Sequence, residues 1–278
     1  MIKDILKEAI EALKTGSDTP ELDARVLLSH AMGKNPGFLY AWPERQVPAE
    51  EYRRFKALLE KRRAGVPIAQ LVGSREFWSM DLKVTEDTLI PRPETERVVE
   101  IALEHIPPFA KWRVLDLGTG SGAIALAIAR ERPDCRVVAT DIDNGALNIA
   151  QRNAAHYKLR NIEFLLGDWF TPLADQHFQC IVANPPYVRM DDPHLSAGDV
   201  RFEPEQALVS GADGLDAIRA IAGAAAAHLE PAGVLILEHG WDQKSEVAVI
   251  LEEGGFREIT CYCDLAGKDR VTRATRHK

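Results

Sequence analysis

The spacing of apolar side chains changes along the chain and separates an N-terminal part from a longer C-terminal part. Up to about residue 65, apolar side chains recur every three or four positions, which is the period of amphipathic helices. The first such stripe consists of Ile5, Leu6, Ala9, Ile10 and Leu13. From about residue 111, short runs rich in apolar residues alternate with helical patterns. The two patterns predict a helical region followed by an α/β region.

Start and stop signals place two further helices in the N-terminal part. Pro20 suits the first turn of a helix with Thr19 at its N-cap, and Gly33 suits its end. A third helix is expected from Pro48 to about Arg63. Its apolar face would hold Tyr52, Phe55, Leu58 and Leu59. These signals predict a small helical bundle as a separate domain over residues 1–73.

The rest of the chain has the pattern of a hairpin followed by a sheet with helices. Residues 74–85 alternate apolar and polar side chains, which indicates a β-hairpin within a linker over 74–92. Seven strand candidates follow: 112–117, 136–140, 162–166, 179–183, 232–238, 256–263 and 270–274. Because helices separate most of them, the pattern predicts a seven-stranded, doubly wound, mainly parallel Rossmann-like sheet in a domain over 93–278. The connection 167–178 is barely long enough for a parallel crossover, so any helix there must be short.

Composition and charge narrow the function classes. The chain has 278 residues, of which 46% are hydrophobic and 27% are charged, as is ordinary for a globular protein. Its net charge of −8 disfavours direct nucleic-acid binding, because phosphate contacts need clustered Lys and Arg. The longest apolar runs fall short of the roughly 20 residues that span a bilayer, and the N-terminus lacks the apolar region of a secretory signal. A cytoplasmic protein without a membrane partner is expected.

The cysteines do not predict a metal site. Cys135, Cys180, Cys261 and Cys263 form no C-x-x-C pair, and none lies near a histidine at ligand spacing. Reduced thiols in or beside strands are expected.

A glycine-rich turn predicts the cofactor site. The stretch "VLDLGTGSGAIALAIA" over 114–129 reads as a strand, a turn and a helix, and ligands of such sheets bind at the carboxyl ends of the strands. The spacing of Gly118, Gly120 and Ala123 also fits a loose dinucleotide pattern. Asp116 argues against a dinucleotide, because its carboxylate would repel a pyrophosphate by about 4 kcal/mol at about 4 Å. S-adenosylmethionine, which carries a sulfonium and no phosphate, suits the acidic turn better.

Three residues at the ends of the next two strands complete the expected nucleoside site. Asp141 ends the second strand, where a carboxylate can accept both ribose hydroxyls. Asp168 and Trp169 follow the third strand, where they are expected to meet the adenine amine and ring, with a core position as the alternative for Trp169. The predicted cofactor-binding residues are Asp116, Gly118, Thr119, Gly120, Ser121, Gly122, Asp141, Asp168, Trp169 and Asn184.

The sequence Asn-Pro-Pro-Tyr ends the fourth strand and predicts the catalytic site. Prolines cannot continue a central strand, so they would stop it and turn Asn184 toward the cleft. The Asn184 side-chain oxygen and the Pro185 carbonyl would hold the two hydrogens of a planar NH₂ group for in-line attack. Tyr187 would stack on that group. Asn184, Pro185 and Tyr187 are the predicted catalytic residues, and Pro186 joins them in the substrate site.

The motif leaves several acceptors open. Adenine, cytosine, guanine and glutamine all present a planar NH₂ group, and the four residues alone do not separate them. A protein that binds the nucleoside and a partner without catalysis is a further alternative, although it would predict damage to this motif. The sequence shows no such damage.

With these motifs, the sequence resembles the bacterial release-factor glutamine methyltransferases. The resemblance lies in these segments: "PIAQLVGSREFW" (67–78), "LIPRPETE" (89–96), "VLDLGTGSGAIALA" (114–127), "GDWF" (167–170), "VANPPYV" (182–188), "FEPEQAL" (202–208), "GADGLD" (211–216) and "DLAGKDRV" (264–271). The glycine turn and Asn-Pro-Pro-Tyr are shared widely among N-methyltransferases. The Ile-Pro-Arg-Pro loop and the N-terminal bundle are more specific to this family.

The resemblance implies a substrate and a division of labour. The family transfers a methyl group from S-adenosylmethionine to the side-chain nitrogen N5 of the glutamine in the Gly-Gly-Gln tip of class I peptide-release factors. It also implies that the N-terminal helices hold the release factor away from the chemistry. Arg92 in the Ile-Pro-Arg-Pro loop either orders that loop or forms a surface ion pair. Two alternatives remain, a methyltransferase of a ribosomal-protein glutamine and a nucleic-acid amino-methyltransferase that acts, for example, on adenine N6.

Overall fold

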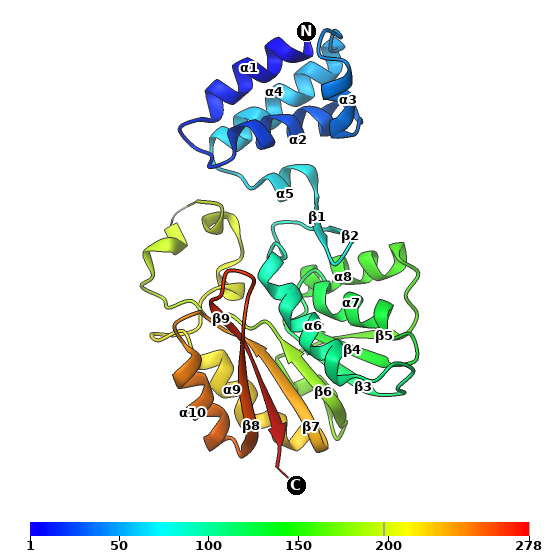
Figure 1. The fold of residues 1–278 in the computed structure, drawn as a ribbon, viewed down its shortest axis with the longest axis vertical. Helices are drawn as coiled ribbons and strands as arrows, with labels where there is room; N and C mark the ends of the chain where they lie inside the picture. Colours follow the sequence, from blue (N-terminus) through cyan, green and yellow to red (C-terminus); the bar gives the residue numbers. More distant parts are fainter. Residues whose placement is uncertain (197, 278) are drawn as a thin grey trace. The chain divides into compact units, whose positions relative to one another are not determined.

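The computed structural model describes residues 1–196 and 198–277 and divides the chain into two compact units. Met1–Ser74 and His194–Phe202 form the first unit, and Arg75–Pro193 and Glu203–Lys278 form the second (Figure 1). The expected domain over 1–73 overlaps the first unit, but the pattern of the sequence did not indicate that the segment 194–202 belongs there. No helix of the described residues is both long and apolar enough to cross a membrane.

The first unit is a bundle of short helices. They are α1 (Ile2–Leu13), α2 (Pro20–Met32), α3 (Pro36–Ala41), α4 (Ala49–Arg63) and α5 (Ile68–Val72). The first helix buries Ile2, Leu6, Ala9 and Leu13, so the centre of its apolar stripe lies slightly to one side of the expected one. The expected helix to Arg63 is confirmed, with Phe55 and Leu59 in the core.

The start and end of α2 differ in how closely they follow the sequence signals. Gly33 ends the helix in the left-handed region at φ 60°, as expected. Thr19 holds the N-cap position but makes no capping bond, and its hydroxyl donates to the Asp23 carboxylate over 3.1 Å.

A buried ion pair fastens the first unit together. Arg62 Nε lies 2.7 Å from Asp23 Oδ2, and the two side chains are only 8% and 6% exposed. Arg62 Nη1 lies 2.7 Å from the carboxylate of Asp199, which is itself half exposed. This guanidinium thus binds a residue 137 positions away and ties the segment 194–202 to the bundle.

The second unit is built on a hairpin and a seven-stranded sheet. The hairpin pairs β1 (Ser74–Phe77) with β2 (Met80–Lys83). The sheet strands are β3 (Arg113–Leu117), β4 (Arg136–Asp141), β5 (Ile162–Leu166), β6 (Phe178–Ala183), β7 (Leu229–Glu238), β8 (Phe256–Cys263) and β9 (Asp269–Arg276). Their order is β5-β4-β3-β6-β7-β9-β8, and β9 runs opposite to the other six strands. The doubly wound, mainly parallel sheet predicted from the sequence is confirmed.

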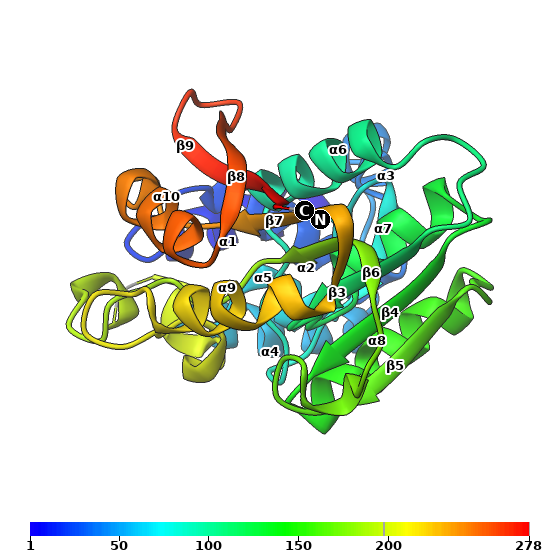
Figure 2. The ribbon, with the colours of Figure 1, turned by 90° about the horizontal axis from the view of Figure 1, so that it is seen from below.

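Helices cover both faces of this sheet. One face packs against α6 (Glu96–His105), α7 (Ala123–Glu131) and α8 (Asn144–His156), and the other against α9 (Asp216–His228) and α10 (Lys244–Glu253), as Figure 2 shows. Alternate residues of β3 divide between the two cores, with Val114 in one and Leu115 in the other. The short crossover before β6 contains only the 3₁₀ turn Thr171–Leu173, as its length required. The strand order reverses between β3 and β6, so their carboxyl ends form the switch point at which ligands bind.

Candidate functional site

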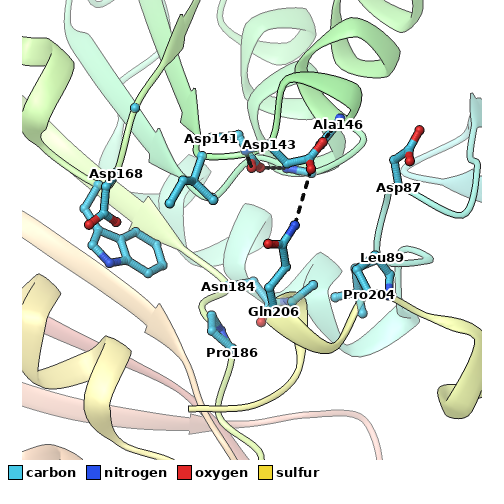
Figure 3. Close-up of a pocket in the computed structure, with 16 residues that line it drawn as sticks. Asp87, Leu89, Asp141, Asp143, Ala146, Asp168, Asn184, Pro186, Pro204 and Gln206 are labelled. Atoms are coloured by element: carbon cyan, nitrogen blue, oxygen red, sulfur yellow. Dashed lines mark hydrogen bonds between the residues drawn. The ribbon is translucent and has the colours of Figure 1, made fainter. Parts of the chain in front are cut away.

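The carboxyl ends of four neighbouring strands open into one cavity. Its space, with the solvent at its open mouth included, amounts to about 710 Å³. The lining residues are Asp87, Leu89, Gly118, Gly120, Asp141, Ile142, Asp143, Ala146, Gly167, Asp168, Trp169, Asn184, Pro186, Pro204, Gln206 and Ala207. Figure 3 shows Asp141 and Asp143 on one side of this cavity, with Asn184 and Pro186 below them. The glycine turn and the Asn-Pro-Pro-Tyr segment therefore meet in one place.

The backbone of the glycine turn has positive φ angles and close contacts that exclude a Cβ atom. Gly122 has φ 88°, and a Cβ there would lie 2.8 Å from Leu126 Cδ1. A Cβ on Gly118, at φ 67°, would lie 3.3 Å from the Trp169 ring. These glycines let the backbone turn tightly between β3 and α7 and leave Gly118 and Gly120 on the cavity wall.

The structure places Asp116 beneath the turn, so the expectation that it faces the ligand is not met. Its side chain is 1% exposed and does not line the cavity. One carboxylate oxygen accepts hydrogen bonds from the Thr119 hydroxyl (2.6 Å) and from Ala125 N (3.2 Å). Burial raises the pKa of Asp116 to about 7, against the effect of these two bonds. Asp116 therefore braces the turn and the start of α7 from within.

Asp141 lies where the sequence predicted it, at the end of β4 on the cavity wall. Its two carboxylate oxygens accept from the backbone N–H groups of Gly120 (2.8 Å) and Asp143 (2.9 Å). Each oxygen keeps a further lone pair, so the fixed carboxylate can also accept hydroxyl groups of a ligand. Burial raises the pKa of Asp141, while the backbone donors lower it.

The remaining predicted cofactor residues divide into two groups. Asp168 and Trp169 line the cavity after β5, and Trp169 has the positive φ of 42° that is uncommon for a bulky residue. Thr119 and Ser121 are buried and do not line it. The Ser121 carbonyl accepts from Asn153 Nδ2 over 2.9 Å, which ties the turn to α8.

The Asn-Pro-Pro-Tyr segment presents only part of its side chains to the cavity. Asn184 and Pro186 line it, whereas Pro185 is buried. Asn184 Nδ2 donates to the Thr95 hydroxyl over 3.1 Å. Tyr187 does not line this cavity, which is not the position expected for a stacking platform. Its hydroxyl donates to Glu238 over 3.1 Å, and Tyr187 borders a second cavity instead.

Sequence reasoning missed the residues that close the outer wall. Asp87 and Leu89 follow the hairpin, and Pro204 and Gln206 come from the "FEPEQAL" segment. Gln206 Nε2 donates to Asp143 Oδ2 at 3.4 Å, which is drawn as the dashed line to Gln206 in Figure 3. Gln206 lies in the "FEPEQAL" segment, which carries part of the family resemblance, so its importance could have been inferred from the sequence. No sequence pattern pointed to Asp87.

Arg92 holds this outer wall in place. Its guanidinium donates to Glu203, whose side chain is fully buried, while Arg92 is one-third exposed. The second oxygen of Glu203 accepts from Ile90 N over 3.2 Å. Of the two roles left open for Arg92, the geometry favours the ordering of the loop.

Comparison with known proteins identifies both parts of the chain. Residues 4–73 match the family described as "PrmC N-terminal domain", and residues 94–203 match "Methyltransferase small domain". The release factor glutamine methyltransferase of Aliivibrio fischeri is 48% identical over 98% of this chain and 96% of its own length. The protein of the same name from Escherichia coli is 47% identical over 96% of each chain.

A solved structure shows the same fold at lower identity. A 16S rRNA methyltransferase from T. thermophilus, solved with AdoMet and guanosine, superposes with a TM-score of 0.54 at 23% identity, over 73% of this chain and 50% of its own. At that identity the likeness concerns the fold alone. The two full-length relatives, each near 47% identical, decide the family. The chain belongs to the release factor glutamine methyltransferases.

Proposed function

We propose that this protein transfers the methyl group of S-adenosylmethionine to the side-chain amide nitrogen of a release-factor glutamine. The observation that carries the proposal is the single cavity in which the glycine turn after β3 and Asn184 after β6 meet. The names of the relatives support glutamine as the acceptor, among the planar NH₂ groups that the motif alone allows. The Gly-Gly-Gln tip of class I release factors is the proposed target.

The lining of the cavity fits this cofactor. Four carboxylates, those of Asp87, Asp141, Asp143 and Asp168, border it. Their negative charges favour a cationic ligand and repel a pyrophosphate. The sequence analysis had assigned this repulsion to Asp116. Asp141 is held by two backbone donors in a position to accept ribose hydroxyls, and Trp169 offers an aromatic face to the adenine. When bound, S-adenosylmethionine supplies an electrophilic methyl group on a sulfonium.

Asn184 and Pro185 are the proposed orienting groups. An amide nitrogen is a weak nucleophile because its lone pair is delocalised. With its two hydrogens held by Asn184 Oδ1 and the Pro185 carbonyl, the substrate nitrogen would be fixed for in-line attack. Asn184 is neutral and does not act as a strong base, so the nitrogen loses its proton after the new N–C bond has formed. Pro186 would border the same substrate, and Tyr187 would support the segment from its bond to Glu238.

In this proposal, the first unit binds the release factor. The match of residues 4–73 to the N-terminal domain of this family supports that assignment. The hairpin residues 74–92 serve as a linker in this proposal, and 93–278 as the methyltransferase domain. Release factors work on ribosomes, so the cytoplasm is the proposed site of action.

A labelling experiment separates the proposed substrate from its alternatives. The purified protein is incubated with methyl-labelled S-adenosylmethionine and, separately, with release factor, ribosomal proteins, tRNA and DNA. Label is expected on the release factor alone, and a release factor with Gln→Ala in its Gly-Gly-Gln motif should stay unlabelled. Label on ribosomal protein, on nucleic acid or on none of them would refute the proposal.

Asp141→Ala is expected to weaken cofactor binding before it affects turnover. Hydrogen bonds to a charged acceptor contribute about 1.5–3 kcal/mol, so the Kd of S-adenosylmethionine should rise about 10- to 150-fold. Calorimetric titration measures this, with Asp134→Ala at an exposed turn as the control. An unchanged Kd in Asp141→Ala would show that this carboxylate does not bind the cofactor.

A further inference from the structure

The helical bundle carries a groove that the proposed chemistry does not use. Side chains of α1 line one part of it, and Leu39 and Tyr40 of α3 line another. Arg25 of α2 and Pro43, which follows α3, complete the lining. All of these residues belong to the first unit, so the groove is separate from the cavity at the strand ends.

Backbone hydrogen bonds fix the two walls of this groove to each other. The first N–H groups of a helix find no partner within the helix. In α1, Ile2 N donates to the Arg45 carbonyl over 2.9 Å, and Lys3 N donates to the Pro43 carbonyl over 3.0 Å. The start of α1 is thus bound to the segment that follows α3. The groove is therefore a fixed part of the first unit and needs no partner to form.

Two aromatic side chains are exposed at this groove. Tyr40 of the lining is 63% exposed, and Trp42, next to Pro43 in the sequence, is 57% exposed. The Arg25 guanidinium lies over the Tyr40 ring, 4.2 Å from its centre. Tyr, Trp and Arg are the residue types enriched where proteins bind one another. This composition indicates a docking surface for another protein.

The groove is basic, although the chain carries a net charge of −8. The charged residues of its lining are Glu11 and the four cations Lys3, Lys7, Lys14 and Arg25. Glu11, Glu21 and Glu44 each form an exposed ion pair with one of these cations. Lys7 has no such partner among the described residues. Because exposed ion pairs are weak, the paired cations can also turn to the carboxylates of a partner.

We propose that this groove binds an acidic surface of the release factor, with Tyr40 as the aromatic anchor and Lys7 and Lys14 as contacts to carboxylates. The inference rests on the proposed function, in which the first unit binds the release factor, and it names the surface that does so. Complementary charge guides the encounter and fixes the orientation of the partner. A nucleic acid fits less well, because the acids between the cations would repel its phosphates.

Charge reversal tests the basic lining. Lys7→Glu combined with Lys14→Glu is expected to raise the Kd of the release factor about 5- to 30-fold at low salt, because each change replaces an attraction by a repulsion. The effect should shrink at high salt, which screens exposed charges. Arg54→Glu combined with Lys56→Glu is the matched control, since both residues are exposed on α4 outside the groove. It should change this Kd less than about twofold.

Removal of one ring tests the aromatic anchor. Tyr40→Ala is expected to raise the Kd of the release factor about 10- to 30-fold, as for a residue at the centre of an interface. Tyr40→Phe keeps the ring and should stay within about threefold of the wild type. Because the ring is mostly exposed, neither change removes core packing, and a thermal melt of each variant checks its fold. Calorimetric titration with release factor measures the Kd without relying on turnover.

Three outcomes would overturn the inference. An unchanged release-factor Kd in the groove variants would show that the partner binds elsewhere on the chain. An equal rise in the α4 control would show that only the overall charge of the first unit matters. A loss of self-association or of tRNA binding, with the release-factor Kd unchanged, would assign the groove to a second copy of the chain or to nucleic acid. A failure of the proposed function looks different, because the wild-type protein would then leave the release factor unlabelled whatever its Kd.

Discussion

Asn184→Ala is expected to reduce kcat about 100-fold or more while leaving the binding of S-adenosylmethionine largely intact. The side chain lines the cavity with Gly118 and Gly120, and its oxygen is the proposed acceptor for the substrate NH₂ group. Without the Asn184 oxygen, the substrate nitrogen is no longer held in line with the methyl group of the cofactor. A misplacement of about 1 Å lowers the rate about 100-fold. Single-turnover methylation of the release factor, together with a calorimetric cofactor titration, measures the two quantities separately.

The control variant removes an asparagine side chain at a position outside the cavity. Asn148 lies on the exposed face of α8, and Asn148→Ala should keep a normal kcat. A near-normal rate in Asn184→Ala would take Asn184 out of the mechanism. A loss of cofactor affinity as large as the loss of rate would instead make it a cofactor-binding residue.

The sheet could be predicted because its signals are local. Buried parallel strands are short apolar runs, and the helices between them have a different period. The strand ends therefore followed from the sequence, and with them the positions of Gly118, Asp141, Asp168 and Asn184. Parallel strands bring such ends to one edge, so the meeting of these four residues in one cavity was also predictable.

The direction of individual side chains was not predictable from the same signals. Asp116 and Asp141 both stand near strand ends, yet one is sealed beneath the turn and the other borders the cavity. The difference depends on the donors that each carboxylate finds, Thr119 and Ala125 N for Asp116 and the Gly120 N–H for Asp141. Burial of Asp116 follows from the three-dimensional course of the turn, which periodicity does not encode.

Partners far away in the sequence account for the other differences. Tyr187 is held by Glu238, 51 positions further along, so its hydroxyl is directed away from the predicted stacking position. Pro193–Ser196 and Val200–Phe202 are short 3₁₀ turns with no periodic signal. Three hydrogen bonds across more than 130 positions explain why the segment 194–202 belongs with the helices. Arg62 donates to the Asp199 carboxylate, Arg201 to the Ala64 carbonyl and Gln70 to the Phe202 carbonyl.

Arg62→Met is expected to destabilise the first unit by about 3–5 kcal/mol, because it removes one partner of a buried ion pair. The Asp23 carboxylate would stay buried, with the hydroxyls of Ser17 and Thr19 as its remaining described donors. For a unit of this size, about 1 kcal/mol shifts the Tm by about 4–8 °C, so its thermal transition should fall by more than about 10 °C. Calorimetry can follow the two units as separate transitions.

Arg63→Met is the matched control for this variant. Arg63 is half exposed and pairs with Glu60 at the surface over 3.2 Å, so its loss should cost only about 0–1 kcal/mol. Because every residue that lines the cavity at the strand ends belongs to the second unit, Arg62→Met should leave the Kd of S-adenosylmethionine unchanged. The KM for the release factor should rise once the first unit unfolds, if that unit holds the substrate. Equal losses in the two variants would show that burial does not decide the strength of the Arg62 pair, and a parallel loss of cofactor binding would show that the two units unfold together.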